Sequence, residues 1–240
     1  MKKESIKFLP CGDSALTVEL AREISEDVNK KIRYLAGKIS ADKKAGIIEC
    51  VPTFCSITVF YDPLLIKKKE LISYINQIFG DYKPGAASTA RVFKIPVCYE
   101  GEFAPDMEDL TKLLGLTREE IIEIHSSRNY LIYMLGFLPG FPYLGGMDKR
   151  IEAPRLDSPR TSIPVGSVGI GGKQTGIYPL ASPGGWRLIG RTPVKVYDPK
   201  REEPILYKAG DYIRFVPISS EEYYKIESDE SYLVECEELR

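Results

Sequence analysis

The sequence predicts a small α+β domain followed by a larger, mostly-β domain folded as a barrel or sandwich. The first 80 or so residues alternate strand-like and helix-like apolar patterns, whereas later residues form short strand-like segments between Gly and Pro turns. Between these regions, residues 83–89 are small, polar and aperiodic, as in a linker. We therefore predict domains at 1–82 and 90–225, followed by an acidic tail at 226–240.

In the N-terminal domain the pattern predicts the order β-α-β-β-α. Residues 16–20 alternate apolar and polar side chains, as in a half-buried strand. Ser25 is a candidate N-cap for a helix whose apolar residues recur on one face. The β-branched runs 47–51 and 56–61 predict a hairpin, and a second amphipathic helix is expected to end at Gly80.

The C-terminal domain is predicted to open with a strand at 92–98 and two helices. The first helix starts near Asp106 and ends at Gly115, and Thr117-Arg-Glu-Glu120 is a capping box for the second. That second helix ends near His125. Further strand-like segments are residues 130–135, 163–170, 186–189, 194–197 and 212–216.

Composition and charge exclude several classes of function. With 33 basic and 34 acidic residues the net charge is −1, so the chain lacks the basic surface of a nucleic-acid binder. Its five cysteines are odd in number and show no C-x-x-C spacing, which argues against a disulfide framework and against an intrinsic metal site. There is no signal-peptide pattern and no apolar run long enough to span a membrane. We therefore expect a cytoplasmic protein that binds neither nucleic acid nor membrane.

The segment from His125 to Gly146 is the most informative part of the sequence. It contains the only histidine, followed by a strand-like stretch and then by aromatic residues interleaved with Gly and Pro. Gly and Pro hold a backbone in irregular conformations, so the aromatic residues, including Phe141 and Tyr143, are expected to line a pocket. His125 is either a helix-ending residue or a general acid–base group, with Tyr130 close by in sequence.

A second block, from Pro154 to Arg191, is rich in glycine and arginine. Its Gly166–Gly176 segment matches neither the P-loop spacing nor G-x-G-x-x-G, so the chain shows no nucleotide-binding motif of its own. Two interpretations remain: a glycine-rich turn bordering a cleft, or a cradle of backbone amides. Arg155 and Arg160 each follow a proline and are suited either to a carboxylate or phosphate ligand or to structural salt bridges. Trp186, the only tryptophan, is expected in a core or an interface.

These blocks resemble a known family, the B subunit of 5-oxoprolinase, which is also labelled KipI or allophanate hydrolase subunit 1. The family is related to the carboxyltransferase part of urea carboxylase. The resemblance runs from about Phe8 to Ile218 and does not include the acidic tail. The motifs that carry it are residues 95–101, His125–Leu144, Pro154–Arg160 and Gly176–Pro193.

The resemblance implies that the C-terminal domain is a cyclophilin-like β-barrel and that the chain is inactive alone. It implies a hetero-oligomer with the C and A subunits of 5-oxoprolinase that converts 5-oxo-L-proline to L-glutamate, with ATP (and Mg²⁺) bound by the complex. The alternatives are a KipI-type inhibitor of a sporulation sensor histidine kinase, or an accessory subunit of an allophanate or urea-amide hydrolase. The sequence does not separate these functions, because one fold can serve several.

Under this resemblance the candidate residues fall into two groups. The catalytic candidates are His125, Tyr130 and Arg155. The substrate-binding candidates are Arg160, Phe141, Tyr143, Gly171, Gly172 and Gln174. In this scheme His125 and Tyr130 transfer or orient a proton, the arginines and the Gly171–Gly172 amides hold anionic groups, and Gln174 bonds an amide. We predict that His125, the 137–143 loop, both arginines and the 171–174 turn converge on one pocket.

Overall fold

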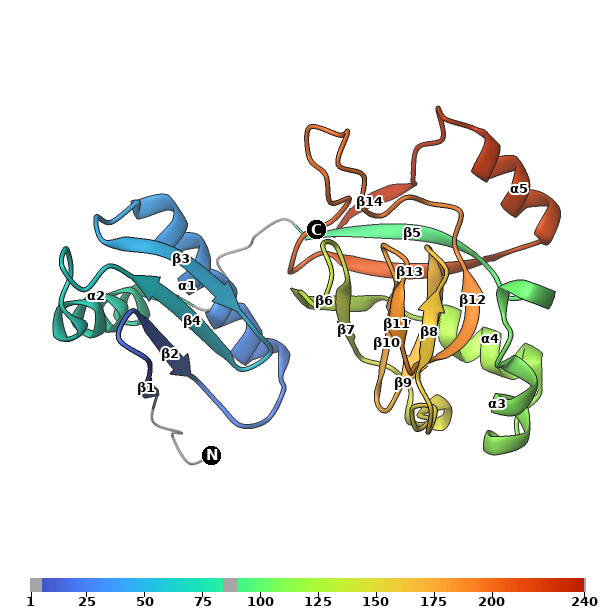
Figure 1. Cartoon of the computed structure of the whole chain (residues 1–240), viewed down its shortest axis with the longest axis horizontal. Helices are drawn as coiled ribbons and strands as arrows, with labels where there is room; N and C mark the ends of the chain where they lie inside the picture. The colour runs from blue at the N-terminus through green and yellow to red at the C-terminus, as the bar shows by residue number, and fades with distance from the viewer. Residues whose placement is uncertain (1–5, 84–89, 240) are drawn as a thin grey trace. The chain divides into compact units, whose positions relative to one another are not determined.

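The computed structural model describes residues 6–83 and 90–239, and the chain divides into two compact units, residues 1–88 and 89–240 (Figure 1). Apart from Lys83, the predicted linker lies outside the described residues. Each unit has its own core of buried apolar side chains.

The N-terminal unit is a four-stranded antiparallel sheet with two helices. Its elements are β1 (Lys7–Cys11), β2 (Ala15–Glu19), α1 (Glu26–Asp42), β3 (Ile47–Pro52), β4 (Ser56–Tyr61) and α2 (Lys68–Asp81). The strand order is β1-β2-β4-β3, so β1 and β3 are the edges (Figure 1). The predicted elements are all present. The sequence pattern missed β1, because it is a largely exposed edge strand that contains Pro10 and has no apolar alternation.

Local sequence explains the first helix. The Ser25 hydroxyl accepts a hydrogen bond from the Val28 N–H at 3.3 Å, which confirms the predicted N-cap. The buried residues of α1 fall on the predicted face and pack against α2 and the sheet in one apolar cluster.

The C-terminal unit is built around an eight-stranded sheet that nearly closes on itself. Its strands are β5 (Ala90–Cys98), β6 (Tyr130–Leu135), β7 (Pro142–Gly145), β9 (Ser167–Gly171), β10 (Gln174–Ile177), β12 (Arg187–Arg191), β13 (Tyr212–Ile218) and β14 (Cys236–Leu239). Seven of them follow the order β10-β9-β12-β5-β13-β6-β7, and the two end strands of this order, β10 and β7, contact each other. The arrangement is barrel-like, as predicted. Strands β8 (Arg160–Ile163) and β11 (Ser182–Gly184) form a separate small ribbon.

Helices α3 (Met107–Leu114) and α4 (Arg118–Ser126) pack against this sheet and lie between β5 and β6 in the sequence. Gly115 ends α3 with a φ of 67°, in the left-handed region that glycine adopts without strain. Thr117 and Glu120 make the reciprocal hydrogen bonds of a capping box, at 2.8 and 3.2 Å. Both predicted helix boundaries are therefore confirmed. Short 3-10 turns at 101–103 and 149–151 complete the connections.

The prediction that residues 226–240 form a tail apart from the barrel is wrong for its last strand. β14 pairs antiparallel with the first half of β5, and Lys94 of β5 forms ion pairs with Glu235 and Glu237. Helix α5 (Ser220–Ser228) precedes it and was not predicted, although Ser219 and Glu222 form a capping box. Residues 194–197, predicted as a strand, instead make only a single bridge, between Tyr197 and Ile205.

Candidate functional site

The β9–β10 hairpin separates two groups of candidate residues. In its register Thr175 pairs with Ile170, and both side chains are buried toward the barrel core. Side chains alternate across a strand, so Gln174 and Gly171, and likewise Gly176 and Gly169, lie on the other, outer face. The hairpin therefore has an inner face toward the core and an outer face that carries the candidate binding residues.

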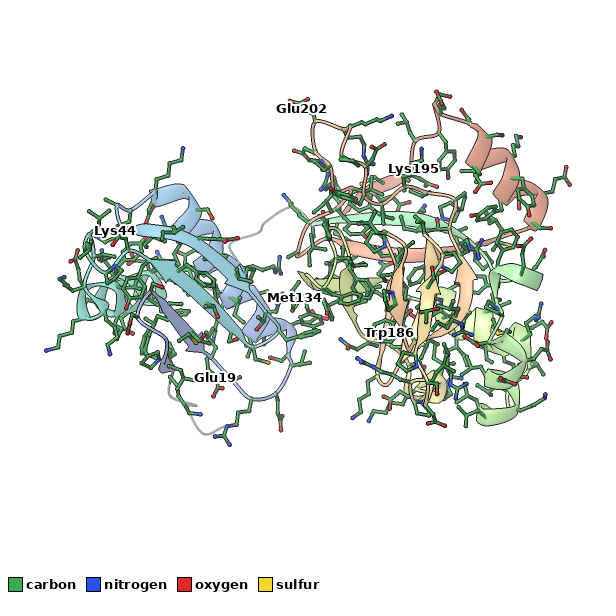
Figure 2. All side chains as sticks on the ribbon, viewed as in Figure 1. Glu19, Lys44, Met134, Trp186, Lys195 and Glu202 are labelled. Carbon is green, nitrogen blue, oxygen red and sulfur yellow. The ribbon has the colours of Figure 1, made fainter. Side chains whose placement is uncertain are left out.

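Glycine residues on the outer face make room for Trp186. A Cβ placed on Gly171 would lie 2.4 Å from the indole Nε1, far inside van der Waals contact. A Cβ on Gly169 or on Gly176 would also touch the tryptophan, at 3.2 Å in each case. The glycine-rich segment is thus required by the close packing of an indole against a sheet. Trp186, which is labelled in Figure 2, is buried as predicted.

Trp186 belongs to a group of aromatic rings that we call the aromatic shelf: Phe141, Tyr143, Tyr178 and Trp186. Phe141 is central, with ring centroids 5.3 Å from Tyr143, 5.3 Å from Tyr178 and 5.5 Å from Trp186, all edge to face. Phe141 and Tyr143 come from the Gly/Pro-rich loop and β7, as the sequence suggested, and Tyr143 is half-buried. The structure adds Tyr178, which the sequence analysis did not single out.

Arg155 and Arg160 lie close enough to Tyr178 to affect its ionisation. Burial raises the pKa of the Tyr178 phenol, and this shift is opposed by a hydrogen bond from the Trp186 backbone and by the positive charges of the two arginines. Arg155 itself is exposed. Two positively charged side chains therefore lie beside the aromatic shelf, and Arg155 is the one exposed to solvent.

Arg160 is held by a buried carboxylate. Its Nη2 donates to Asp106 Oδ1 at 2.6 Å, and Asp106 Oδ2 accepts from the Leu188 N–H at 2.6 Å. The Arg160 Nη1 is buried and has no hydrogen-bond partner among residues 6–83 and 90–239. Of the two roles that the sequence suggested for Arg160, the structural salt bridge is thus present. The Nη1 group of the guanidinium remains without a partner among the described residues. Asp106, 54 residues away, was not predicted as a partner.

The backbone at Gly172 does not form the predicted amide cradle. The Gly172 N–H donates to the Ala153 carbonyl at 2.7 Å, and the Gly172 carbonyl accepts from the Ala153 N–H at 3.2 Å. The amide is therefore occupied by the bridge between the two segments, with Gly172 at a φ of 65° in the turn. Gln174, half-buried, stays on the outer face beside Gly171 and remains a candidate for bonding an amide.

His125 lies on the opposite, inner face and is completely buried. Its Nδ1 is 2.8 Å from the Tyr99 hydroxyl, and its Nε2 is 2.8 Å from the Thr175 hydroxyl. Thr175 Oγ1 donates its only proton to the Gly169 carbonyl, so it accepts from His125 Nε2–H, and Nδ1 accepts from Tyr99. The imidazole ring also stacks on Phe215, with centroids 4.4 Å apart.

Tyr130 belongs to the same buried network. Its hydroxyl donates to the backbone carbonyl of His125 at 2.8 Å, and its side chain is buried. The prediction that His125 shares one pocket with the arginines and the aromatic loop is therefore wrong. The sequence could not show that the partners of this histidine, 26 and 50 residues away, enclose it in the barrel core.

The loop before β7 holds one more aromatic residue in an unusual conformation. Phe137 has a φ of 65°, which is uncommon outside glycine, and its side chain is 62% exposed. The Leu138 N–H donates to the Gly136 carbonyl at 2.8 Å and the Phe141 N–H to the Leu138 carbonyl at 3.0 Å, so consecutive turns fix the loop. Phe137 packs edge-on against Phe141 at the border of the aromatic shelf.

Three further features of the described residues concern metal ligands, cysteine thiols and the length of apolar helices. No group of three or more His, Cys, Asp or Glu side chains in the described ranges is arranged to hold a metal ion. The five cysteines are all free. Among the helices that the structure describes, none is long and apolar enough to cross a bilayer.

Comparison with known proteins identifies the family. Residues 6–207 match the family described as "Carboxyltransferase domain, subdomain C and D". The chain is 46% identical to the B subunit of 5-oxoprolinase from Bacillus subtilis (strain 168), covering 91% of this chain and 96% of that relative. The chain therefore belongs to the carboxyltransferase subdomain C and D family, together with the B subunit of 5-oxoprolinase.

Two other comparisons bear on fold and function. The solved structure of TTHA0988 matches with a TM-score of 0.77 and 34% identity, covering 86% of this chain and 40% of that longer chain. A more distant relative is the urea amidolyase of Saccharomyces cerevisiae (strain ATCC 204508 / S288c), 25% identical over 93% of this chain and 14% of that protein.

The glycine–tryptophan packing leads to a testable prediction. We expect Gly171→Ala to destabilise the chain by roughly 1–3 kcal/mol, because the new methyl group overlaps the indole and must displace it. Trp186 is the only tryptophan, so its fluorescence reports this displacement directly. Gly37→Ala is the matched control, since open space surrounds a Cβ there within α1. An unchanged emission spectrum and unfolding midpoint for Gly171→Ala would contradict the packing described.

Proposed function

We propose that this chain is the B subunit of an ATP-dependent 5-oxoprolinase that converts 5-oxo-L-proline to L-glutamate together with the C and A subunits. The observation that carries the proposal is the 46% identity to the B subunit of a 5-oxoprolinase over nearly the full length of both chains. The outer face of the β9–β10 hairpin supports it, because cationic and aromatic side chains gather there.

The substrate is a small ring that carries a carboxylate and a lactam amide. In this proposal the accessible guanidinium of Arg155 binds the carboxylate, and Arg160, which Asp106 holds, adds a second positive charge near Tyr178. Tyr143, the half-buried member of the aromatic shelf, packs against the apolar ring carbons, and the buried rings of Phe141, Tyr178 and Trp186 support it from below. Gln174, on the same face, bonds the lactam N–H or oxygen through its side-chain amide.

ATP makes the stable lactam reactive. Transfer of the γ-phosphoryl group to the lactam oxygen releases ADP and leaves an electrophilic carbon. Water adds to that carbon, the ring C–N bond breaks, and hydrolysis of the remaining acyl phosphate gives glutamate and phosphate. Because the chain has no P-loop or G-x-G-x-x-G motif, we assign ATP and its Mg²⁺ to the assembled complex.

His125 and Tyr130 have no proton-transfer role in this proposal. Both side chains are buried on the inner face and bonded to other protein groups. Their contribution is to hold β10 in place from the inside through Thr175, while the neighbouring residues of β10 face the candidate site.

The test is reconstitution. We expect the purified chain alone to show no cleavage of 5-oxoproline, and co-expression with the A and C subunits to give 5-oxoproline-dependent ATP hydrolysis with equimolar glutamate. Robust turnover by the homogeneous single chain, or a reconstituted complex without activity toward 5-oxoproline, would contradict the proposal.

A urea-related activity is the second candidate, favoured by the similarity to urea amidolyase over 93% of this chain. The same reconstituted complex, assayed with allophanate or urea in place of 5-oxoproline, separates the two. The inhibition of a sensor histidine kinase stays a prediction from the resemblance alone.

A further inference from the structure

An open groove lies in the N-terminal unit, between the end of α1 and β3. Its volume is about 240 Å³, and its lining includes Ile39, Lys43, Lys44, Ile48, Glu49 and Cys50. β3 is an edge strand, and Ile48 on it is 71% exposed. A large apolar side chain that water surrounds at an unpaired strand edge is a common feature of surfaces that bind an extended segment.

A second segment, residues 64–70, which contains Lys67, Lys68 and Lys69, lies next to the groove-lining residues. The Gly46 carbonyl accepts from the Asp62 N–H at 2.8 Å, and a Cβ on Gly46 would lie 3.1 Å from that of Leu65. These contacts bring segments 43–50 and 64–70 together. Lys44, labelled in Figure 2, lies 3.5 Å from Glu70 across this junction.

The two segments form a surface that is both basic and apolar, which we call the lysine groove. Residues 43–50 and 64–70 contain five lysines against the two acidic residues Glu49 and Glu70. Within the described parts of the chain Lys44 pairs with Glu70, and the other four lysines take part in no ion pair, although Lys67 donates to the Pro63 carbonyl. Leu64 and Leu65 are 86% and 69% exposed. The ligand of such a surface carries carboxylates on both sides of an apolar anchor.

The C-terminal segment of the same sequence has this chemistry. Residues 229–235 contain three carboxylates and no basic residue. Tyr232, Leu233 and Val234 separate Asp229 and Glu230 from Glu235, which pairs with Lys94. Leu233 is 87% exposed, and the residues from 232 to 235 are neither helical nor in a strand. The segment is presented between two anchored elements, α5 and β14. We call it the acidic loop.

We infer that the lysine groove of one copy of this chain binds the acidic loop of a second copy, with Leu233 inserted beside Ile48. The lysines then face Asp229 and Glu230, which form no ion pair within the described parts of the chain. The contact uses different surfaces on the two copies, so it is heterologous. The inference does not depend on the proposed function, because neither surface includes a residue of the candidate site.

Self-association of the full chain tests the inference by sedimentation velocity over a concentration series. We expect a reversible species larger than the monomer that weakens between low and high salt, because the attraction is partly between exposed charges. Leu233→Asp and Ile48→Asp are each expected to weaken association at least about tenfold. Leu113→Asp is the matched control, since Leu113 is also an exposed leucine, on α3, outside both surfaces.

Mixing the two defective variants is the sharpest experiment. Ile48→Asp keeps an intact acidic loop and Leu233→Asp keeps an intact lysine groove, so the mixture is expected to form heterodimers although each variant alone stays monomeric. Circular dichroism of each variant checks that it is folded. A wild-type chain that stays monomeric at all concentrations overturns the inference. So does binding of that monomer to phosphatidylserine vesicles through Ile48, which would assign the groove to anionic lipid.

Discussion

Arg155→Ala is expected to lower the turnover of 5-oxoproline by the reconstituted complex at least about a hundredfold while leaving the chain folded. Arg155 is exposed and borders the aromatic shelf, and a guanidinium–carboxylate contact in a partly desolvated site contributes a few kcal/mol. As an exposed surface residue, it should change the free energy of unfolding by less than about 1 kcal/mol when truncated. Steady-state kinetics and urea unfolding of the same preparation measure the two effects.

Arg214→Ala is the matched control, because Arg214 is also exposed but lies on β13, in another part of the sheet. It should leave both turnover and stability unchanged. If Arg155→Ala retains full activity in a complex that assembles normally, Arg155 does not bind the substrate. If the complex fails to assemble, the residue belongs to a subunit interface.

Local patterns predicted much of the fold because their physical causes are local. Ser25 and the Thr117–Glu120 box act within one helical turn, and each began a helix at the predicted position. The same rule applied to Ser219 and Glu222 would have found α5. β14 has four exposed residues, so its pairing depends on Lys94 and on the free edge of β5, which no local pattern reveals.

The candidate site was only partly predictable because its decisive contacts join distant segments. The sequence identified the aromatic loop and the two arginines, but the Asp106 that holds Arg160 is 54 residues away. The sequence left two interpretations open for Gly166–Gly176, a turn bordering a cleft or a cradle of backbone amides. In the structure, Gly169 and Gly171 make room for the indole of Trp186 on the outer face. The sequence therefore identified candidate residues by their type. It did not show which face of the β9–β10 hairpin each of them occupies.

His125 is likewise buried by residues that are distant in the sequence, and its burial is expected to make the stability of the chain depend on pH. Burial lowers the pKa of its imidazole from 6.5 to about 3 in the folded chain. In the unfolded chain the group is in water and titrates near its ordinary value. Between these two values the unfolded state binds more protons than the folded state, so stability rises with pH there and falls as the pH drops below about 6.5. Above that range the histidine is neutral in both states and contributes no pH dependence.

We expect His125 to lower the free energy of unfolding by about 2 kcal/mol between pH 7.5 and pH 5. The expected slope is about 1.4 kcal/mol per pH unit below pH 6.5. The reference is the double variant His125→Phe/Tyr99→Phe, which keeps an aromatic ring against Phe215 and leaves no hydroxyl at position 99 without its acceptor. Carboxylates titrate equally in both proteins, so the difference between their urea-unfolding free energies isolates the histidine. His125 is the only histidine, and its single imidazole NMR signal therefore gives the folded pKa without assignment. A signal that titrates near pH 6.5, or a stability difference that stays constant from pH 7.5 to 5, would show that His125 is accessible to solvent and would restore it as a candidate acid–base group.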